Sequence, residues 1–283
     1  MMFLLRYLPL SLAIREILRI RALSTLRYFE CPILDVGCGD GLFWETLIYD
    51  QSVTKLSCLK DLFGIDISDS ELQLCCARFD KHGANSLNFD ISKCDLEGSE
   101  LDHLRGKCKT VIANCSLEHV PDIQNALINI REFLAVGGTF VLFLPHPRWT
   151  RSLSIHNLFS RFSNRLSGCY AGIFDGFFQH YHLYPHYVWK ALLESCGFGN
   201  VDIKGIGSQS ANRHFSNWIP ASIPAFAWKS VSGRYPSWYS SIKKAYLKRQ
   251  TGLVNELIDR SFIKTDLEDP SIVEFFIRCT NVQ

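Results

Sequence analysis

Short apolar runs alternate with segments of helical periodicity between residues 31 and 143. The apolar runs are rich in β-branched residues and lack polar alternation, which is typical of strands buried on both faces. The pattern predicts an α/β fold: a doubly wound, mostly parallel sheet with helices between its strands. The runs predicted to be strands are Cys31–Gly37, Leu62–Ser68, Ser86–Ile91, Lys109–Cys115 and Thr139–Pro145.

The helical segments between these runs have recognisable ends. Residues 69–83 predict a helix capped by Ser68 or Asp69 and stopped by Gly83. Residues 121–138 predict a second helix, with proline at its start and glycines at its end.

Beyond Pro145 the regularity fades, although a helix at 185–198 and strands at 200–207 and 271–282 are predicted. Two aromatic stretches without a clean period separate these elements, and the second holds one predicted helix, at 251–262. The expected organisation is an N-terminal helical lid (1–30), a Rossmann-like core (31–147), a substrate-facing insertion (148–185), a helix and strand of the core (186–207), an aromatic cap insertion (208–269) and a closing strand (270–283).

Composition narrows the functional classes. The net charge is +2 without a long block of like charge, so no nucleic-acid-binding surface is expected. The eleven cysteines contain no CxxC pair, which favours small buried side chains (Cys31, Cys38, Cys94 and Cys115 among them) in a reducing, cytoplasmic compartment. Arginines interrupt the apolar N-terminus, so a membrane span is not expected, and weak contact of an amphipathic helix with a membrane surface is the alternative.

The stretch "ILDVGCGDG" joins a predicted strand to a predicted helix through Gly37, Gly39 and Gly41. Such a turn is expected to leave backbone N–H groups unpaired and pointing outward, and glycines let a ligand approach them. A dinucleotide-binding loop would need its third glycine one residue later, where Leu42 stands.

Carboxylates follow the next two predicted strands. Asp66 ends the second strand beside the glycine loop, where it can bind both hydroxyls of a ribose. Asp95 follows the third strand, within expected reach of an adenine amino group.

The motifs "ILDVGCGDG", "GIDIS", "CDLEG", "NCSLEHVPD" and "FLAVGGTFVLF" resemble, in order and spacing, the small-molecule (type 11-like) branch of the class I S-adenosylmethionine-dependent methyltransferases. The resemblance implies a seven-stranded sheet with an antiparallel last strand, and S-adenosyl-L-methionine as cofactor. It implies that Asp35, Gly37, Gly39 and Gly41 line the methionine end of the cofactor, that Asp66 holds the ribose with Ile67 against the adenine, that Asp95 and Leu96 bind the adenine edge, and that Asn114 to Leu117, Ser116 included, flank the sulfonium.

Methyl transfer needs an in-line approach and a nucleophile relieved of its proton. His119 and His146 follow the fourth and fifth predicted strands, at the edge where open α/β sheets bind ligands. Both are candidate general bases, and His119 has the alternative role of capping the following helix.

A metal site is not expected. Glu118 and His119 resemble the metal-binding pair of quinone O-methyltransferases, but Cys115 occupies the place of that family's additional acid. His180, His182 and His186 have a spacing that can ligate zinc, yet a loop before a helix is the favoured interpretation.

The resulting hypothesis is methyl transfer to the O, N or C atom of a small molecule, such as a metabolite, glycan precursor or lipid-like acceptor. A catalytically silent cofactor-binding protein and a membrane-surface enzyme acting on a lipid-linked acceptor are the alternatives. Methylation of protein or nucleic acid is disfavoured, because "NCSL" replaces the "NPPY"-type motif. The oligomeric state stays open. Aromatic residues of the insertions are expected to form acceptor-binding walls or the core of a helical cap: Trp149, Phe174, Phe177, Phe178, Trp218, Trp228 and Trp238.

Overall fold

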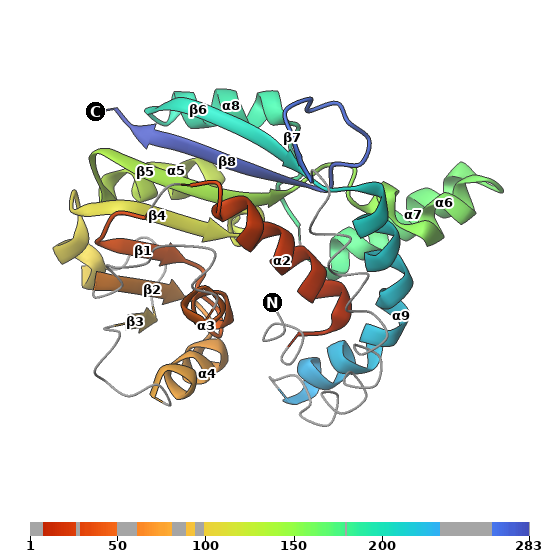
Figure 1. Ribbon diagram of the computed structural model, residues 1–283, viewed down its shortest axis with the longest axis horizontal. Helices are drawn as coiled ribbons and strands as arrows, with labels where there is room; N and C mark the ends of the chain where they lie inside the picture. Colours follow the sequence, from red (N-terminus) through yellow and green to blue (C-terminus); the bar gives the residue numbers. More distant parts are fainter. Residues whose placement is uncertain are drawn as a thin grey trace. The chain divides into compact units, whose positions relative to one another are not determined.

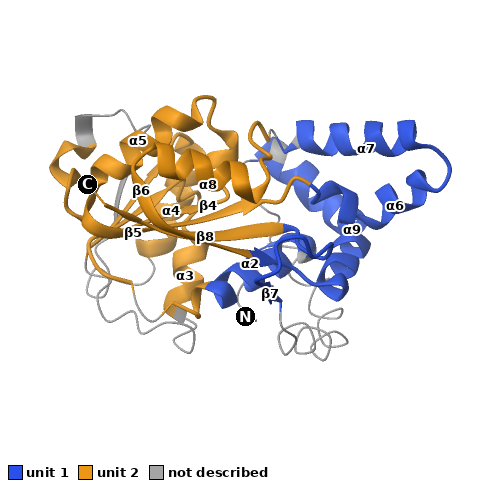
Figure 2. Cartoon of the chain, turned by 90° about the horizontal axis from the view of Figure 1, so that it is seen from above, with its two compact units in different colours: residues 1–22, 148–178, 205–273 blue, residues 23–147, 179–204, 274–283 orange. Residues whose placement is uncertain are grey.

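The computed structural model describes residues 8–26, 29–49, 61–80, 89–93, 99–178, 180–232 and 262–282. The chain divides into two compact units, each built from three separate segments (Figure 2). Unit 1 contains Met1–Ala22, Arg148–Phe178 and Gly205–Val273, and unit 2 contains Leu23–Pro147, Gln179–Lys204 and Glu274–Gln283.

Unit 2 is built around a twisted sheet (Figure 1). Its strands in the described residues are β1 (Ile33–Val36), β2 (Leu62–Asp66), β3 (Phe89–Lys93), β4 (Cys108–Asn114), β5 (Leu134–Pro145), β6 (Phe198–Ile206) and β8 (Glu274–Asn281), in the order β3-β2-β1-β4-β5-β8-β6. The first five strands pair in parallel, and β8 pairs antiparallel with β5, with Phe143 opposite Phe276. The predicted fold class, a seven-stranded sheet with an antiparallel last strand, is confirmed.

Helices connect the parallel strands. They are α3 (Leu42–Tyr49), α4 (Asp69–Phe79), α5 (Ile123–Phe133) and α8 (His186–Ser195), with short 3₁₀ turns η3 (Ser99–Leu104) and η4 (Leu117–His119). Helices α5 and α8 cover one face of the sheet, and α3 lies on the other (Figure 2). Because parallel crossovers are right-handed, the reversal of strand order at β1 places the crossovers that lead to β2 and β3 on the face opposite to those that lead to β4 and β5.

Helix α4 begins as predicted. The Ser68 side chain accepts a hydrogen bond from the backbone N–H of Glu71 at 3.4 Å, so Ser68 rather than Asp69 is the cap. The helix ends at Phe79, and Gly83, its predicted stop, lies outside the described residues.

The prediction for the end of α5 was wrong. The helix ends at Phe133, because Leu134 is already extended (φ −74°, ψ 132°) and pairs with Cys108 of β4. The glycines expected to end the helix lie inside β5, where Gly137 has a φ of +77°. Buried strand pairing at Leu134 therefore overrides the helical periodicity.

Unit 1 is mostly helical in its described residues. It contains most of α2 (Leu10–Leu23), together with η5 (Thr150–Ser152), α6 (Ser154–Ser160), α7 (Asn164–Phe177), α9 (Gln209–Ser232) and the two-residue β7 (Ile263–Lys264), which pairs with Gly205 and Ile206. Trp149 is central to its core: the indole donates to Asp175 at 3.0 Å, and the Arg15 guanidinium lies 5.3 Å from its ring centre.

Helices α6, α7 and α9 correct the prediction of irregular structure in both aromatic stretches. Helix α9 contains Pro220 and Pro224, which normally interrupt helices. Burial of its apolar side chains, Trp218 among them, stabilises the helix despite these prolines. The helix predicted at 251–262 lies almost entirely outside the described residues.

The cysteine prediction was correct only in part. Every cysteine that the structure describes has a free thiol, and Cys38 is buried, but Cys31 and Cys115 are only half-buried. Cys94 lies outside the described residues. No helix within the described ranges combines the length and apolar character that a membrane crossing requires.

Candidate functional site

A cavity of about 550 Å³ lies at the carboxyl ends of β1, β2 and β4. The order of the strands reverses at this point, because β2 and β4 flank β1 on opposite sides. Open α/β sheets bind ligands at such switch points. The cavity wall consists of Val36, Gly37, Ile65, Asp66, Ile67, Cys115, Ser116, His119, Val120, Pro121, Asp122, Asn125, Ala126 and Asn129.

The glycine loop forms one side of this cavity through Gly37. All three glycines have positive φ angles, 79° at Gly37, 54° at Gly39 and 71° at Gly41. A Cβ on Gly37 would lie 2.4 Å from the Cβ of Ser116, and one on Gly41 would lie 2.5 Å from the Cys75 sulfur. The loop therefore needs glycine at Gly37 to approach the end of β4, and at Gly41 to pack against α4.

The backbone N–H groups of this loop are not left unpaired, which corrects the sequence-based expectation. Those of Gly37 and Cys38 both donate to the carbonyl of Ile65, at 2.8 and 2.9 Å. That of Gly39 donates to Oδ2 of Asp66 at 2.9 Å. The loop is thus tied to β2 before any ligand binds.

Asp66 is the best-positioned of the predicted ligand-binding residues. Its Oδ2 accepts from Gly39, its Oδ1 accepts from the backbone N–H of Ser68 at 2.9 Å, and the residue lines the cavity half-buried. A carboxylate offers about four acceptor positions, so each oxygen can accept a further hydrogen bond. The next residue, Ile67, also lines the cavity with its side chain 75% exposed.

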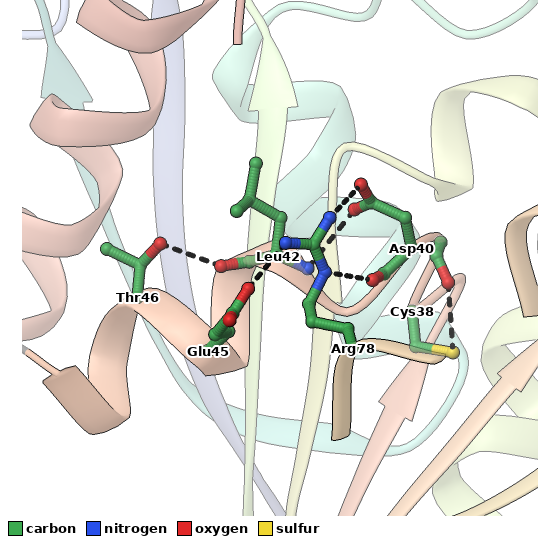
Figure 3. Close-up of polar contacts among 7 residues, drawn as sticks. Cys38, Asp40, Leu42, Glu45, Thr46 and Arg78 are labelled. Atoms are coloured by element: carbon green, nitrogen blue, oxygen red, sulfur yellow. Dashed lines mark hydrogen bonds and ion pairs between the residues drawn. The ribbon is translucent and has the colours of Figure 1, made fainter. Parts of the chain in front are cut away.

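Arg78 of α4 fixes the other side of the loop (Figure 3). Its Nε donates to the Asp40 carbonyl at 2.7 Å, and its guanidinium forms ion pairs with the carboxylates of Asp40 (2.7 Å) and Glu45. Burial lowers the pKa of Arg78, but these two carboxylates more than compensate, so the pKa is raised overall. One side chain thereby joins the glycine loop to the first turn of α3.

Asp35, predicted to line the methionine end of a cofactor, is 1% exposed and is not part of the cavity wall. Its Oδ2 accepts a 2.7 Å hydrogen bond from the indole N–H of Trp44 in α3. The structure therefore shows a contact that holds β1 to the following helix.

The segment after β4 forms the opposite wall. Cys115 has a left-handed backbone (φ 53°), and its N–H donates to the Phe143 carbonyl at 3.1 Å. The Ser116 hydroxyl donates to the Val36 carbonyl at 2.6 Å, which ties this wall to the end of β1. Asn114, the last residue of β4, is half-buried and does not line the cavity.

The two candidate bases are placed differently. His119 lines the cavity with 40% of its side chain exposed, and its ring stacks on that of His180, with centres 5.5 Å apart. The alternative capping role for His119 is wrong, because Asp122 caps α5 by accepting from the Asn125 N–H at 3.0 Å. His146 is buried, 4.8 Å from the Phe275 ring, and does not line the cavity.

Several wall residues were not singled out from the sequence. Asp122 caps α5, and Asn125 and Asn129 lie one turn apart on that helix. A usable signal was present: a polar i, i+4 pair lies on the helix that directly follows the strand at the switch point. Asp95 and Leu96, predicted to bind adenine, lie outside the described residues.

Comparison with known sequences gives a family match. Residues 30–164 match the model of a methyltransferase domain family. Uncharacterized methyltransferases of Mycobacterium bovis and Mycobacterium tuberculosis are each 27% identical over 110 residues, which cover 39% of this chain and 48% of each relative. The chain thus spans about half the length of the curated relatives it matches.

Solved structures share the fold. A SAM-dependent methyltransferase from Thermotoga maritima matches with a TM-score of 0.54 and 13% identity, over 96% of this chain and 91% of that protein. Geranyl diphosphate C-methyltransferase from Streptomyces coelicolor, in complex with Mg²⁺, geranyl diphosphate and S-adenosyl-L-homocysteine, matches with a TM-score of 0.52 and 13% identity, over 93% of this chain and 77% of that protein. At such low identity these likenesses show the fold alone.

Proposed function

We propose that the chain transfers a methyl group from S-adenosyl-L-methionine to a small-molecule acceptor, in line with the match of residues 30–164 to the model of a methyltransferase domain family. The main support for this proposal is the cavity at the switch point. Asp66 lies on its wall, and backbone N–H groups orient both oxygens of the Asp66 carboxylate. An oriented carboxylate is suited to bind a pair of neighbouring hydroxyls, as a ribose presents.

The rest of the wall fits an adenosyl group. Ile67 offers an exposed apolar side chain next to Asp66, suited to cover a flat aromatic base. Gly37 lacks the Cβ that would collide with Ser116, so the loop and the end of β4 approach closely on the opposite side. We place the methionine end of the cofactor in the cavity beside this contact, where Gly37 and Ser116 both line the wall.

The cofactor supplies a methyl group already activated by its sulfonium. The chain then needs to exclude water, orient the acceptor and, where the acceptor carries a proton, remove it. His119 is the candidate general base that removes this proton, because it lies on the cavity wall and His146 does not. Trp149 and Trp218 of the two insertions are buried within unit 1, which favours the helical-cap alternative for these aromatic residues over walls for the acceptor.

The comparisons support this proposal at the level of class. The Streptomyces coelicolor structure holds S-adenosyl-L-homocysteine, the product form of the cofactor. A Haemonchus contortus phosphoethanolamine N-methyltransferase, which also shares the fold (TM-score 0.53, 12% identity), holds S-adenosyl-L-methionine. One methylates carbon and the other nitrogen, so these relatives do not select an acceptor atom.

The test is transfer of a deuterated methyl group from the cofactor to small molecules of a cell extract, followed by mass spectrometry. We expect one or a few metabolites to gain the label with the wild-type protein and to lose it with Asp66→Ala. If the protein binds the cofactor but labels nothing across extracts, the catalytically silent alternative is correct.

A further inference from the structure

We propose that Glu118, His119 and His180 form a binding site for a first-row divalent transition metal such as Zn²⁺ at the edge of the cavity. One ligand atom from each residue lies within 4.8 Å of those of the other two. Among the residues that the structure describes, these three are the only His, Cys, Asp or Glu side chains whose possible ligand atoms come this close together as a group of three. Sequence motifs alone do not indicate this site, because Cys115 lacks a carboxylate and His180 belongs to a distant segment.

The backbone brings the two segments together. Glu118 and His119 are consecutive in η4, whereas His180 comes from the segment before α8. The N–H of Tyr181 donates to the Glu118 carbonyl at 2.8 Å, and His182 Nε2 lies 2.6 Å from the Val120 carbonyl. The contacts with Glu118 and Val120, the two neighbours of His119 in the chain, hold the segment of His180 against η4. They do so without relying on contacts among the side chains of Glu118, His119 and His180.

The sequence-based zinc candidate, with His180, His182 and His186, has a different arrangement. The two ring nitrogens of His182 contact the Tyr184 hydroxyl (2.9 Å) and the Val120 carbonyl, and His186 packs against Phe275. Of these three histidines, only His180 belongs to the proposed metal site. The other two ligands of that site, Glu118 and His119, come from η4.

The geometry is close to that of a bound metal. Zinc–nitrogen bonds of about 2.0–2.1 Å place the centres of two imidazoles on one metal roughly 5–6 Å apart. The ring centres of His119 and His180 are 5.5 Å apart. His119 Nε2 lies 3.8 Å from Glu118 Oε1, and all three ligand atoms lie within 4.8 Å of one another, so closing on a metal requires ligand atoms to approach by roughly 0.5–1.5 Å.

The donor set selects the kind of metal. Two imidazole nitrogens and one carboxylate oxygen form the ligand set of catalytic zinc sites, which leave a further position open. Imidazole suits zinc, cobalt, nickel and iron, whereas Mg²⁺ and Ca²⁺ prefer sites made of oxygen ligands. The Glu118 side chain is only 2% exposed, and a dication compensates for the cost of burying its charge.

The open position has a functional consequence, which rests on the proposed methyl transfer. His119 belongs to the cavity wall together with Ser116. A metal on His119 would therefore adjoin the space assigned to the acceptor, and it would replace His119 as general base, because the cation itself lowers the pKa of a bound hydroxyl. Such a cation binds oxygen, so the site favours an acceptor that carries a hydroxyl or carboxylate group.

The test is calorimetric titration of metal-free protein with ZnCl₂ and, in parallel, with MgCl₂. We expect one equivalent of Zn²⁺ to bind and Mg²⁺ not to bind. Glu118→Gln and His180→Ala should each weaken Zn²⁺ binding at least tenfold. The matched control is His103→Ala, which removes an exposed histidine of η3 and should leave binding unchanged.

Absence of Zn²⁺ binding to the wild-type protein, or equal binding by Glu118→Gln, overturns the proposal. His180→Ala also removes the ring packed against His119. X-ray absorption of the wild-type zinc complex therefore provides a second measurement, and it should show two imidazole ligands. Binding of S-adenosyl-L-homocysteine is measured on the same samples without metal. If the metal-free wild-type protein does not bind S-adenosyl-L-homocysteine, the proposed function is contradicted. If it binds S-adenosyl-L-homocysteine but not Zn²⁺, only the metal site is contradicted.

Discussion

The backbone N–H of Gly39 donates a 2.9 Å hydrogen bond to Oδ2 of Asp66, so the glycine loop after β1 and the end of β2 share one carboxylate. Ser68 donates to the other oxygen of the same group. The carboxylate proposed to bind the ribose is thus oriented by protein N–H groups before a ligand arrives. A preorganised group loses less freedom on binding, which favours affinity.

Gly37→Ala should destabilise the protein strongly. The new Cβ would lie 2.4 Å from that of Ser116, at a φ of +79° that L-residues rarely adopt. Strain of about 1–2 kcal/mol adds to overpacking of about 1–3 kcal/mol. Urea unfolding measures the loss. In the matched control Gly106→Ala, φ is +68° but no atom lies within 4 Å of the new Cβ, so only the strain is expected. Equal losses in both variants would show that the contact with Ser116 is unimportant.

Arg78→Met should reduce the free energy of unfolding by about 2–4 kcal/mol, because it leaves the carboxylates of Asp40 and the buried Glu45 without their cation. Cofactor affinity should fall with it, since Arg78 holds the glycine loop. Arg105→Met is the control: its ion pairs with Asp102 and Glu132 are more exposed, and about 1 kcal/mol or less is expected. Chemical denaturation of both variants tests the difference. A larger loss in Arg105→Met would contradict the role assigned to Arg78.

Cys108 should resist alkylation in the native protein. Burial raises the pKa of its thiol from 9.0 to about 12, so the reactive thiolate is scarce at pH 8. Iodoacetamide labelling followed by peptide mass spectrometry should modify the exposed Cys76 and Cys169 and spare Cys108 until the chain unfolds.

The same shift predicts a pH dependence. The folded state keeps the Cys108 proton at a pH where the unfolded state releases it. The stability contributed by the neutral thiol is therefore complete below about pH 9 and declines as the pH rises toward 12. Native-state labelling of Cys108 at a rate equal to that of Cys169 would contradict its burial.

The order and type of the core elements were predictable from sequence, because buried parallel strands and amphipathic helices have strong local patterns. The strand before Gly37 and the cap at Ser68 are examples. Helix α9 was not predictable: Pro220 and Pro224 oppose a helix locally, and only burial of neighbours such as Trp218 stabilises it. Likewise, Leu134 leaves α5 because it pairs with Cys108, a contact that no local pattern encodes.

For the site, sequence motifs located Gly37, Asp66, Ile67, Ser116 and His119, all of which line one cavity. Motifs could not show that Asp35 contacts Trp44, since this depends on how α3 packs on β1. They also could not place His180 against His119, because some sixty residues separate the two and their meeting depends on backbone contacts of Glu118. The roles of these residues in catalysis stay predictions.

Asp66 is proposed to bind the ribose of the cofactor in the cavity that it lines together with Gly37. Calorimetric titration with S-adenosyl-L-homocysteine tests it most directly, on the wild-type protein, on Asp66→Asn and on Asp69→Asn, an exposed carboxylate three residues away that does not line the cavity. We predict that Asp66→Asn weakens binding at least tenfold, about 1.4 kcal/mol, and that Asp69→Asn binds like the wild type. Unchanged affinity in a folded Asp66→Asn protein would contradict the account.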